Sequence, residues 1–154
     1  MMTGKYFDDI QIGQVFETEP HKVSRSEIIS FAESFDPNPF HLDEMAAKHV
    51  GLPSVIASGL HTLSLSFRLF FDLHLWDDAI MPSPGIDKVR WLKPLLPDQT
   101  IRVRATVTDT KLWKPAYGVV RMLHETIETT SDNPILTVDA MHRLKRQTST
   151  AGAT

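Results

Sequence analysis

The stretch from Gly59 to Trp76 is the most apolar part of this 154-residue chain, and its apolar residues recur at helical spacing. The side chains at intervals of three and four are Leu60, Leu63, Phe67, Phe70 and Phe71. Four further leucines (Leu65, Leu69, Leu73 and Leu75) make the predicted helix, Ser58 to Trp76, apolar most of the way round. Such a helix is normally buried in a core. The rest of the chain therefore has to supply the surfaces that cover it.

Three predicted strands in the second half supply such a cover. Apolar and polar residues alternate over Ile101–Thr108 and Ile135–Leu144, while Val119–Thr129 is rich in β-branched residues. Turn signals at Lys114-Pro115 and Asp132-Asn133-Pro134 separate these strands. Successive strands joined by short turns indicate an antiparallel sheet. The predicted class is α+β, with the long helix lying across the sheet.

Two shorter helices are expected before the long one. Ser24 and Glu27 fit a capping box that starts the first helix, and Pro37 marks its end. The apolar stripe expected on this helix is Ile28, Phe31, Ala32 and Phe35. A second short helix is predicted from about Asp43 to just before Gly51.

Length and composition limit the possible functions. We expect one domain over residues 1–146 and a flexible polar tail over 147–154. The net charge of −3 lacks the basic excess typical of nucleic-acid binding, and the absence of cysteine excludes disulfides and a thiol nucleophile. The N-terminus has no signal-peptide core, and charged residues interrupt the apolar stretch, so we expect a soluble cytoplasmic protein outside the membrane.

The segment from Asp36 to His41, with sequence DPNPFH, contains the first candidate site residues. Pro37 and Pro39 restrict the residues before them to extended conformations, which stiffens the link between Asp36 and His41. An Asp and a His held close together are the usual groups for moving protons near neutral pH. The same residues are also good turn formers between two helices, and the residues alone favour this structural interpretation.

The second candidate is the start of the long helix, where Ser58 precedes Gly59. The first N–H groups of a helix lack partners within it, and a glycine there leaves the backbone open to a ligand oxygen. This arrangement suits an oxyanion site. A serine cap followed by a closely packed glycine is the simpler alternative, and the helix itself would tolerate alanine at position 59.

Taken together, the two features resemble the MaoC-like dehydratases and (R)-specific enoyl-CoA hydratases of the hot-dog fold. The signature of that family is a D-x-N-P-x-H run followed by a glycine that opens the central helix. Asp36, Asn38, Pro39 and His41 match the run, and Gly59 matches the glycine. The stretch Gly85–Pro94 resembles the family's strand leading into an R/K-P turn. The resemblance implies a single hot-dog fold, an antiparallel sheet wrapped around the central helix.

The resemblance also implies an activity, the reversible addition of water to a trans-2-enoyl-CoA to give an (R)-3-hydroxyacyl-CoA. Asp36 and His41 would be catalytic, Gly59 would bind the thioester oxygen, and Asn38 and Ser58 would support them. No metal or other cofactor is expected, because the CoA thioester is itself the substrate. Two alternatives stay open: a hot-dog acyl-CoA thioesterase and a non-catalytic acyl-CoA-binding subunit.

We also expect at least a homodimer. The predicted strands Val119–Ile127 and Ile135–Leu144 carry apolar residues on both faces, and only one face of each can cover the helix. A second protomer is the natural cover for the other face, and the resemblance implies the same assembly.

Overall fold

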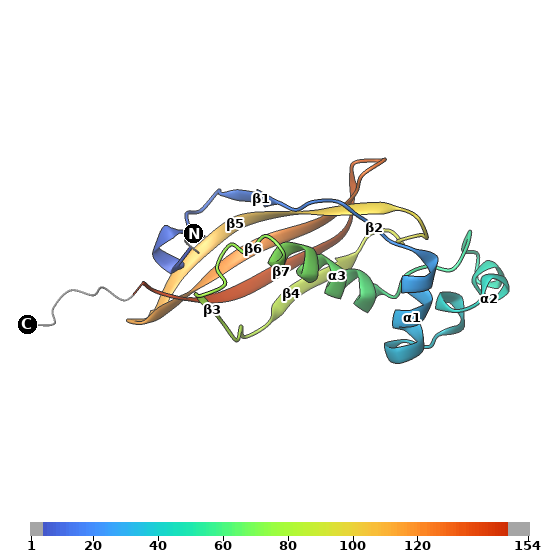
Figure 1. The fold of residues 1–154 in the computed structure, drawn as a ribbon, viewed down its shortest axis with the longest axis horizontal. Helices are drawn as coiled ribbons and strands as arrows, with labels where there is room; N and C mark the ends of the chain where they lie inside the picture. The colour runs from blue at the N-terminus through green and yellow to red at the C-terminus, as the bar shows by residue number, and fades with distance from the viewer. Residues whose placement is uncertain (1–4, 148–154) are drawn as a thin grey trace, which may run out of the picture.

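The computed structural model describes residues 5–147 and shows one curved antiparallel sheet with the helix α3 (Gly59–Phe71) lying across it (Figure 1). The strands are β1 (Val15–Glu17), β2 (His21–Lys22), β3 (Ile80–Met81), β4 (Ile86–Trp91), β5 (Thr100–Lys114), β6 (Tyr117–Glu128) and β7 (Asn133–Lys145). The long strands β5, β6 and β7 form the middle of the sheet. At one edge β1 and β2 both pair with β5, and at the other edge β3 and β4 both pair with β7. The predicted α+β class is confirmed. Of the predicted tail, residues 148–154 lie outside the described part.

The three middle strands are longer than the alternation in the sequence predicted. β5 continues to Lys114, six residues beyond Thr108, because a register shift between Val107 and Asp109 moves the later side chains relative to β6. An extra residue of this kind interrupts the alternation without ending the strand. The predicted turn at Lys114-Pro115 is confirmed, since Lys114 pairs with Tyr117 across the hairpin.

Two helices and two short 3-10 turns lie before α3: η1 (Phe7–Asp9), α1 (Arg25–Phe35), η2 (Pro39–His41) and α2 (Glu44–His49). The capping box of α1 is confirmed, because Glu27 N–H donates to Ser24 Oγ at 3.1 Å and Ser24 N–H donates to the Glu27 carboxylate at 2.7 Å. The expected apolar stripe is wrong at its last position. Phe35 is 71% exposed, because the last turn of α1 lies beyond the end of the sheet (Figure 1).

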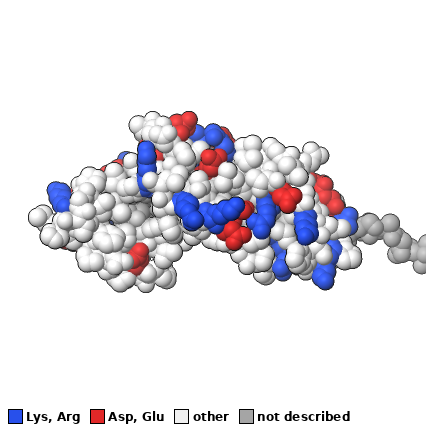
Figure 2. Space-filling view, turned by 180° about the vertical axis from the view of Figure 1, so that it is seen from behind, with Lys and Arg blue, Asp and Glu red and all other residues white. Residues whose placement is uncertain are grey.

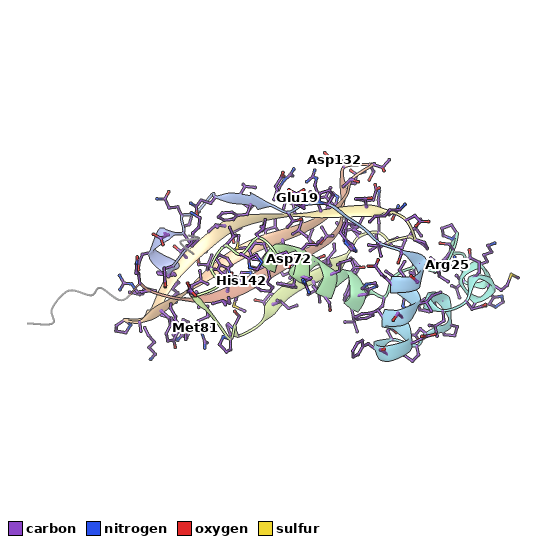
Figure 3. All side chains as sticks on the ribbon, in the orientation of Figure 1. Glu19, Arg25, Asp72, Met81, Asp132 and His142 are labelled. Carbon is purple, nitrogen blue, oxygen red and sulfur yellow. The ribbon has the colours of Figure 1, made fainter. Side chains whose placement is uncertain are left out.

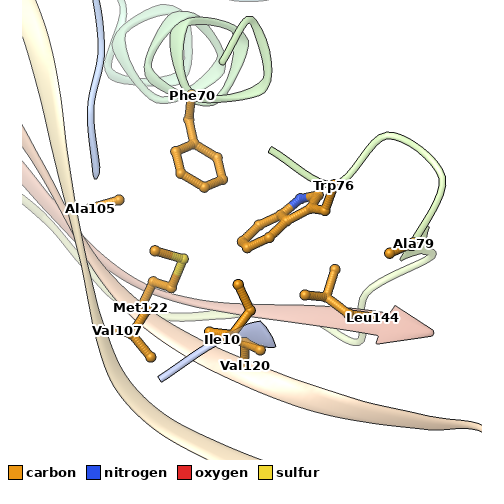
Figure 4. Packing of buried hydrophobic residues seen from close by; sticks show 9 residues of the cluster. All are labelled: Ile10, Phe70, Trp76, Ala79, Ala105, Val107, Val120, Met122 and Leu144. Atoms are coloured by element: carbon orange, nitrogen blue, oxygen red, sulfur yellow. The ribbon is translucent and has the colours of Figure 1, made fainter. Parts of the chain in front are cut away.

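The predicted end of the central helix at Trp76 is also wrong. α3 ends at Phe71, and His74 then adopts a left-handed conformation with φ of 52° that turns the chain back. Trp76 consequently packs against Phe70, with 5.4 Å between the ring centres. Figure 4 shows these two rings above the sheet, in a cluster with Ile10, Ala79, Ala105, Val107, Val120, Met122 and Leu144.

The sheet buries only one side of α3, which corrects the expectation of a helix buried nearly all round. Among its buried side chains are three polar ones, His61, Thr62 and Ser66. Ser66 Oγ lies 2.6 Å from both the Thr62 carbonyl and Thr126 Oγ1, so the buried hydroxyl is fully hydrogen-bonded. On the other side, Leu60 and Phe71 are 48% and 42% exposed.

The outer face of the sheet carries charges of both signs, side by side on the reverse of the molecule (Figure 2). Arg102 pairs with Asp132, and Arg104 pairs with Glu17 on the neighbouring strand. The outer side of β5 is therefore solvated. No helix in the described part of the chain is long and apolar enough to cross a membrane.

Candidate active site

The loop after α1 brings Asp36 and His41 together. Asp36 is the C-terminal capping residue of α1, and the turn η2 starts at Pro39 and returns the chain toward it. Within this loop the backbone N–H of His41 donates to the Asn38 carbonyl at 3.0 Å. The outcome is a distance of 3.2 Å between His41 Nε2 and Asp36 Oδ2. The stiff link expected from the two prolines thus holds an acid–imidazole pair.

The hydrogen bonds of His41 fix the position of its proton. Its Nδ1 lies 2.7 Å from the carbonyl oxygen of Ile56, which can only accept, so Nδ1 carries a hydrogen. The other ring nitrogen, Nε2, faces the carboxylate of Asp36. Nε2 is therefore the nitrogen of this buried imidazole that can exchange a proton with a bound molecule.

The Asp36 carboxylate is held in its ionised form by two donors. Ser58 Oγ donates to Oδ2 at 2.7 Å, and the Asn38 amide donates to Oδ1. The hydrogen bond from Ser58, assisted by that of Asn38 and by the nearby imidazole of His41, lowers the pKa of Asp36 below its ordinary value. Asp36 therefore stays an anion at neutral pH, positioned to accept hydrogen bonds.

Ser58 also begins the central helix. Its Oγ accepts from the backbone N–H of Leu60 at 3.2 Å, the standard contact of a serine cap. Within residues 5–147 the preceding N–H, that of Gly59, has no acceptor. Unpaired N–H groups and the helix dipole together give this end of α3 a positive potential.

Trp91 packs directly on Gly59. The indole Nε1 donates to the Gly59 carbonyl at 2.8 Å, and a Cβ atom added to Gly59 would lie 2.6 Å from Trp91 Cε2. Only glycine leaves room for the indole in this position. Gly59 thus packs closely, as the simpler interpretation expects, and its free N–H leaves the oxyanion role a prediction.

These residues surround one pocket of about 480 Å³. Its lining consists of Asp36, His41, Leu52, Ile56, Ala57, Gly59, Leu60, Thr62, Trp91, Leu92, Lys93, Pro94 and Leu95. Of the five predicted site residues, the structure places Asp36, His41 and Gly59 on the pocket wall. Asn38 and Ser58 lie behind the wall and contact Asp36.

Two pocket residues, Trp91 and Thr62, were not among the predicted site residues. Trp91 follows a distorted segment of β4, where a register shift against β7 and the positive φ of Lys88 (51°) redirect the strand. An aromatic residue just before Lys93-Pro94 is the only sequence signal for it. Ser64 and Ser66, the serines of the central helix, do not line the pocket.

No three His, Cys, Asp or Glu side chains in the described ranges lie close enough to hold a metal ion. A reaction without metal or other cofactor stays a prediction from the sequence.

The comparisons with known proteins identify the family and the fold. The sequence model of the MaoC like domain family matches residues 9–129, which include every predicted site residue. An uncharacterised protein of Bacillus subtilis, YdeM, is 34% identical over 119 residues. The match covers 77% of this chain and 84% of the length of YdeM.

Two solved structures define the fold further. A MaoC-like dehydratase from Rhodospirillum rubrum is 27% identical with a TM-score of 0.84, over 94% of this chain and 99% of its own. A conserved hypothetical protein from Mycobacterium tuberculosis, described as a double hot-dog fold, is 21% identical with a TM-score of 0.77. This chain covers 47% of that protein, while the match spans 97% of this chain. The predicted single hot-dog fold is confirmed.

Proposed function

This chain belongs to the MaoC-like domain family, and from that premise we propose that it is a hydro-lyase acting on 3-hydroxyacyl and trans-2-enoyl thioesters. The observation that supports the proposal best is the convergence of three groups on one pocket: the Asp36 carboxylate, the His41 imidazole and the unpaired N–H of Gly59. Addition of water to an enoyl thioester needs a base for the water and a donor for the thioester oxygen. In this proposal Asp36 and His41 supply the base, and the Gly59 N–H supplies the donor.

In the proposed reaction a water molecule binds beside the Asp36–His41 pair and contacts both side chains. The carboxylate accepts one hydrogen bond from this water and orients it, and His41 Nε2 accepts its other proton as the oxygen attacks the β-carbon. The carbonyl of Ile56 holds the Nδ1–H, so the imidazolium that forms is hydrogen-bonded at both nitrogens. The proton on Nε2 then passes to the α-carbon. The water is consumed as hydroxyl and proton, and the imidazole returns to its neutral form.

Negative charge develops on the thioester oxygen between the two steps. The Gly59 N–H at the positive end of α3 is the donor that we assign to this oxygen. A single donor of this kind typically contributes about 3–4 kcal/mol to the transition state. Trp91 holds the Gly59 carbonyl and thereby fixes the orientation of this first turn.

The substrate class and stereochemistry follow from the family resemblance. Leu52, Ile56 and Leu60 give the pocket an apolar wall that suits an acyl chain. We propose a CoA thioester as substrate, an (R)-3-hydroxyacyl product and a cytoplasmic location. We also propose a homodimer, because this chain covers about half of a protein described as a double hot-dog.

The test is to mix the purified chain with crotonyl-CoA and to follow two signals. One signal is the ultraviolet absorbance of the conjugated enoyl thioester, and the other is free thiol. Loss of the absorbance without thiol release is the expected result. Thiol release would identify a thioesterase instead. Tight binding without either change would identify an acyl-CoA-binding subunit.

A further inference from the structure

A second pocket, of about 360 Å³, lies at the opposite end of α3 from the candidate active site. Its walls are Phe67, Phe71, Ile80, Met81, Ser83, Gly85, Ile86, Met141 and His142. None of these residues lines the first pocket. Figure 3 shows Met81 and His142 near one another, far from Arg25 at the start of α1. Along the helix, Gly59 and Phe71 are about 18 Å apart at 1.5 Å per residue.

One lining residue of this pocket, His142, belongs to a buried pair of imidazoles. His124 and His142 are each 2% exposed, and their Nε2 atoms lie 3.0 Å apart. Aromatic rings surround the pair, with Phe70 at 4.6 Å from His124 and Trp76 at 5.3 Å from His142 between ring centres. Burial lowers the pKa of both, to about 3 for His124 and about 4 for His142. Both rings are therefore neutral at pH 7, and one Nε2–H donates to the other Nε2.

The partners of the remaining nitrogens indicate which ring donates. The Nδ1 of His124 is buried and has no hydrogen-bond partner. An orphaned N–H is rarer in protein interiors than an acceptor with a free lone pair. His124 Nδ1 is therefore best assigned as the unprotonated nitrogen, so that His124 carries its hydrogen on Nε2. His142 Nε2 then accepts, and His142 carries its own hydrogen on Nδ1.

This N–H has no acceptor among residues 5–147, although His142 lines the pocket. Ser83, the other polar side chain on the wall, is already used, since its Oγ accepts from the Arg143 backbone and donates to the Met81 carbonyl. The walls of the pocket are thus apolar, and one of its lining residues, His142, carries a donor that no group in the described part of the chain uses. We propose that this pocket is a second ligand site, which takes an uncharged, mostly apolar molecule bearing one carbonyl-type acceptor for His142 Nδ1–H.

The chemistry of the walls supports this class of ligand. Phe67 and Phe71 give flat apolar surface, and the flexible side chains of Met81 and Met141 adapt to irregular shapes. No Lys, Arg, Asp or Glu side chain lines the pocket, so a charged ligand would find no counter-charge. The site does not depend on the proposed hydration reaction.

The test uses binding, so it gives an answer whether or not the chain is a hydratase. The probes are 2-octanone and 2-methyl-1-octene, which share a shape but differ in the acceptor oxygen. The reporters are ¹³C-labelled methionine methyl groups, with Met81 and Met141 in the pocket and Met45, 71% exposed on α2, as the internal control. We expect 2-octanone to shift the signals of Met81 and Met141 and to leave that of Met45 unchanged.

The His142→Phe variant keeps a ring and removes the donor. In this variant the dissociation constant of 2-octanone, divided by that of 2-methyl-1-octene, should rise about two- to tenfold. This is the usual effect of losing one hydrogen bond. In the wild-type protein, 2-octanone should also shift the ¹⁵N–¹H signal of His142 Nδ1. The proposal would be overturned by any of three results: an unprotonated His142 Nδ1, no response of Met81 and Met141, or the same ratio of dissociation constants in the wild type and in His142→Phe.

Discussion

Ser58 donates a hydrogen bond of 2.7 Å to the same carboxylate oxygen of Asp36 that lies 3.2 Å from His41 Nε2. Because Ser58 is also the N-terminal cap of α3, the start of the central helix is tied directly to the loop that follows α1. The start of α3 and the acid–imidazole pair are therefore held at a fixed separation. The proposed reaction needs such an arrangement, because its base and its oxygen donor act on the same substrate.

Replacing Ser58 with alanine should raise the pKa of Asp36 toward its ordinary value, because this hydrogen bond is the main cause of its depression. A carboxyl group with a depressed pKa adds stability above its unfolded pKa and loses it as the pH falls through the folded one. Near neutral pH the free energy of unfolding of Ser58→Ala should therefore be lower by that contribution and by about 1 kcal/mol for the lost helix cap. Carbon-13 NMR titration of the Asp36 carboxyl measures the shift. Ser34→Ala, at an exposed position of α1, is the matched control, and an unchanged Asp36 pKa in Ser58→Ala would contradict this account.

Gly59→Ala should lower both stability and turnover, which differs from the expectation drawn from helix propensity alone. The added methyl group would lie 2.6 Å from Trp91 Cε2, so the indole has to move. Thermal unfolding of Gly59→Ala in the wild-type and Trp91→Leu backgrounds tests this cause. The cost of alanine should shrink by about 1 kcal/mol or more when the indole is absent. Equal costs in the two backgrounds would show that Trp91 is not the obstacle.

The pair His124 and His142 should make the fold sensitive to mild acid. Their pKa values in the folded chain are about 3 and about 4, below the ordinary value of 6.5, so the unfolded chain binds protons that the folded chain does not. The free energy of unfolding should therefore fall as the pH drops from about 6.5 toward 4, by about 3 kcal/mol for His142 alone. Urea unfolding at pH 7 and pH 5 measures this, and His142→Phe should flatten the dependence. The control His49→Phe, at an exposed position, should keep the steep pH dependence of the wild type. An equally steep pH dependence in His142→Phe would contradict the role of the imidazole pair in acid sensitivity.

The chain should be at least a homodimer in solution. Among the described strands β4 pairs only with β7, so it is an edge strand. Ile86 and Trp91 at its two ends and Leu92 just after it, which also line the two pockets, are 39%, 49% and 52% exposed. An exposed apolar edge of this kind is a surface for a second chain. Light scattering at micromolar concentration should give at least twice the 17.4 kDa of one chain, and Ile86→Asp should lower the mass. A wild-type mass near 17.4 kDa would refute the prediction.

The sequence predicted the architecture because its signals were local. The capping box at Ser24 and Glu27 and the alternation in the long strands each act within a few residues, and each appears in the structure. The errors occurred where distant contacts decide the outcome. Trp76 leaves the helix because it packs with Phe70 in a cluster that includes Val120 and Leu144, two sheet residues far from it in the sequence.

The candidate site shows the same division. Asp36, His41 and Gly59 were found because a short motif and one glycine mark them. The bond from Trp91 to Gly59 spans 32 residues, and the imidazole pair joins His124 to His142 across two strands. Such contacts depend on the register of the sheet and on the distortion in β4, which periodicity does not specify.

Hydration of crotonyl-CoA by the wild-type chain, Asp36→Asn and His41→Ala is the most direct test of the proposed function. Asp36→Asn keeps the shape and removes the charge, and His41→Ala removes Nε2, so each should lower the rate of enoyl absorbance loss by about 10² or more while the chain stays folded. Glu33→Gln and His49→Ala, at exposed positions near these residues in the sequence, should keep the full rate. Full hydratase activity in Asp36→Asn or His41→Ala would contradict the assignment of this pair as the catalytic centre.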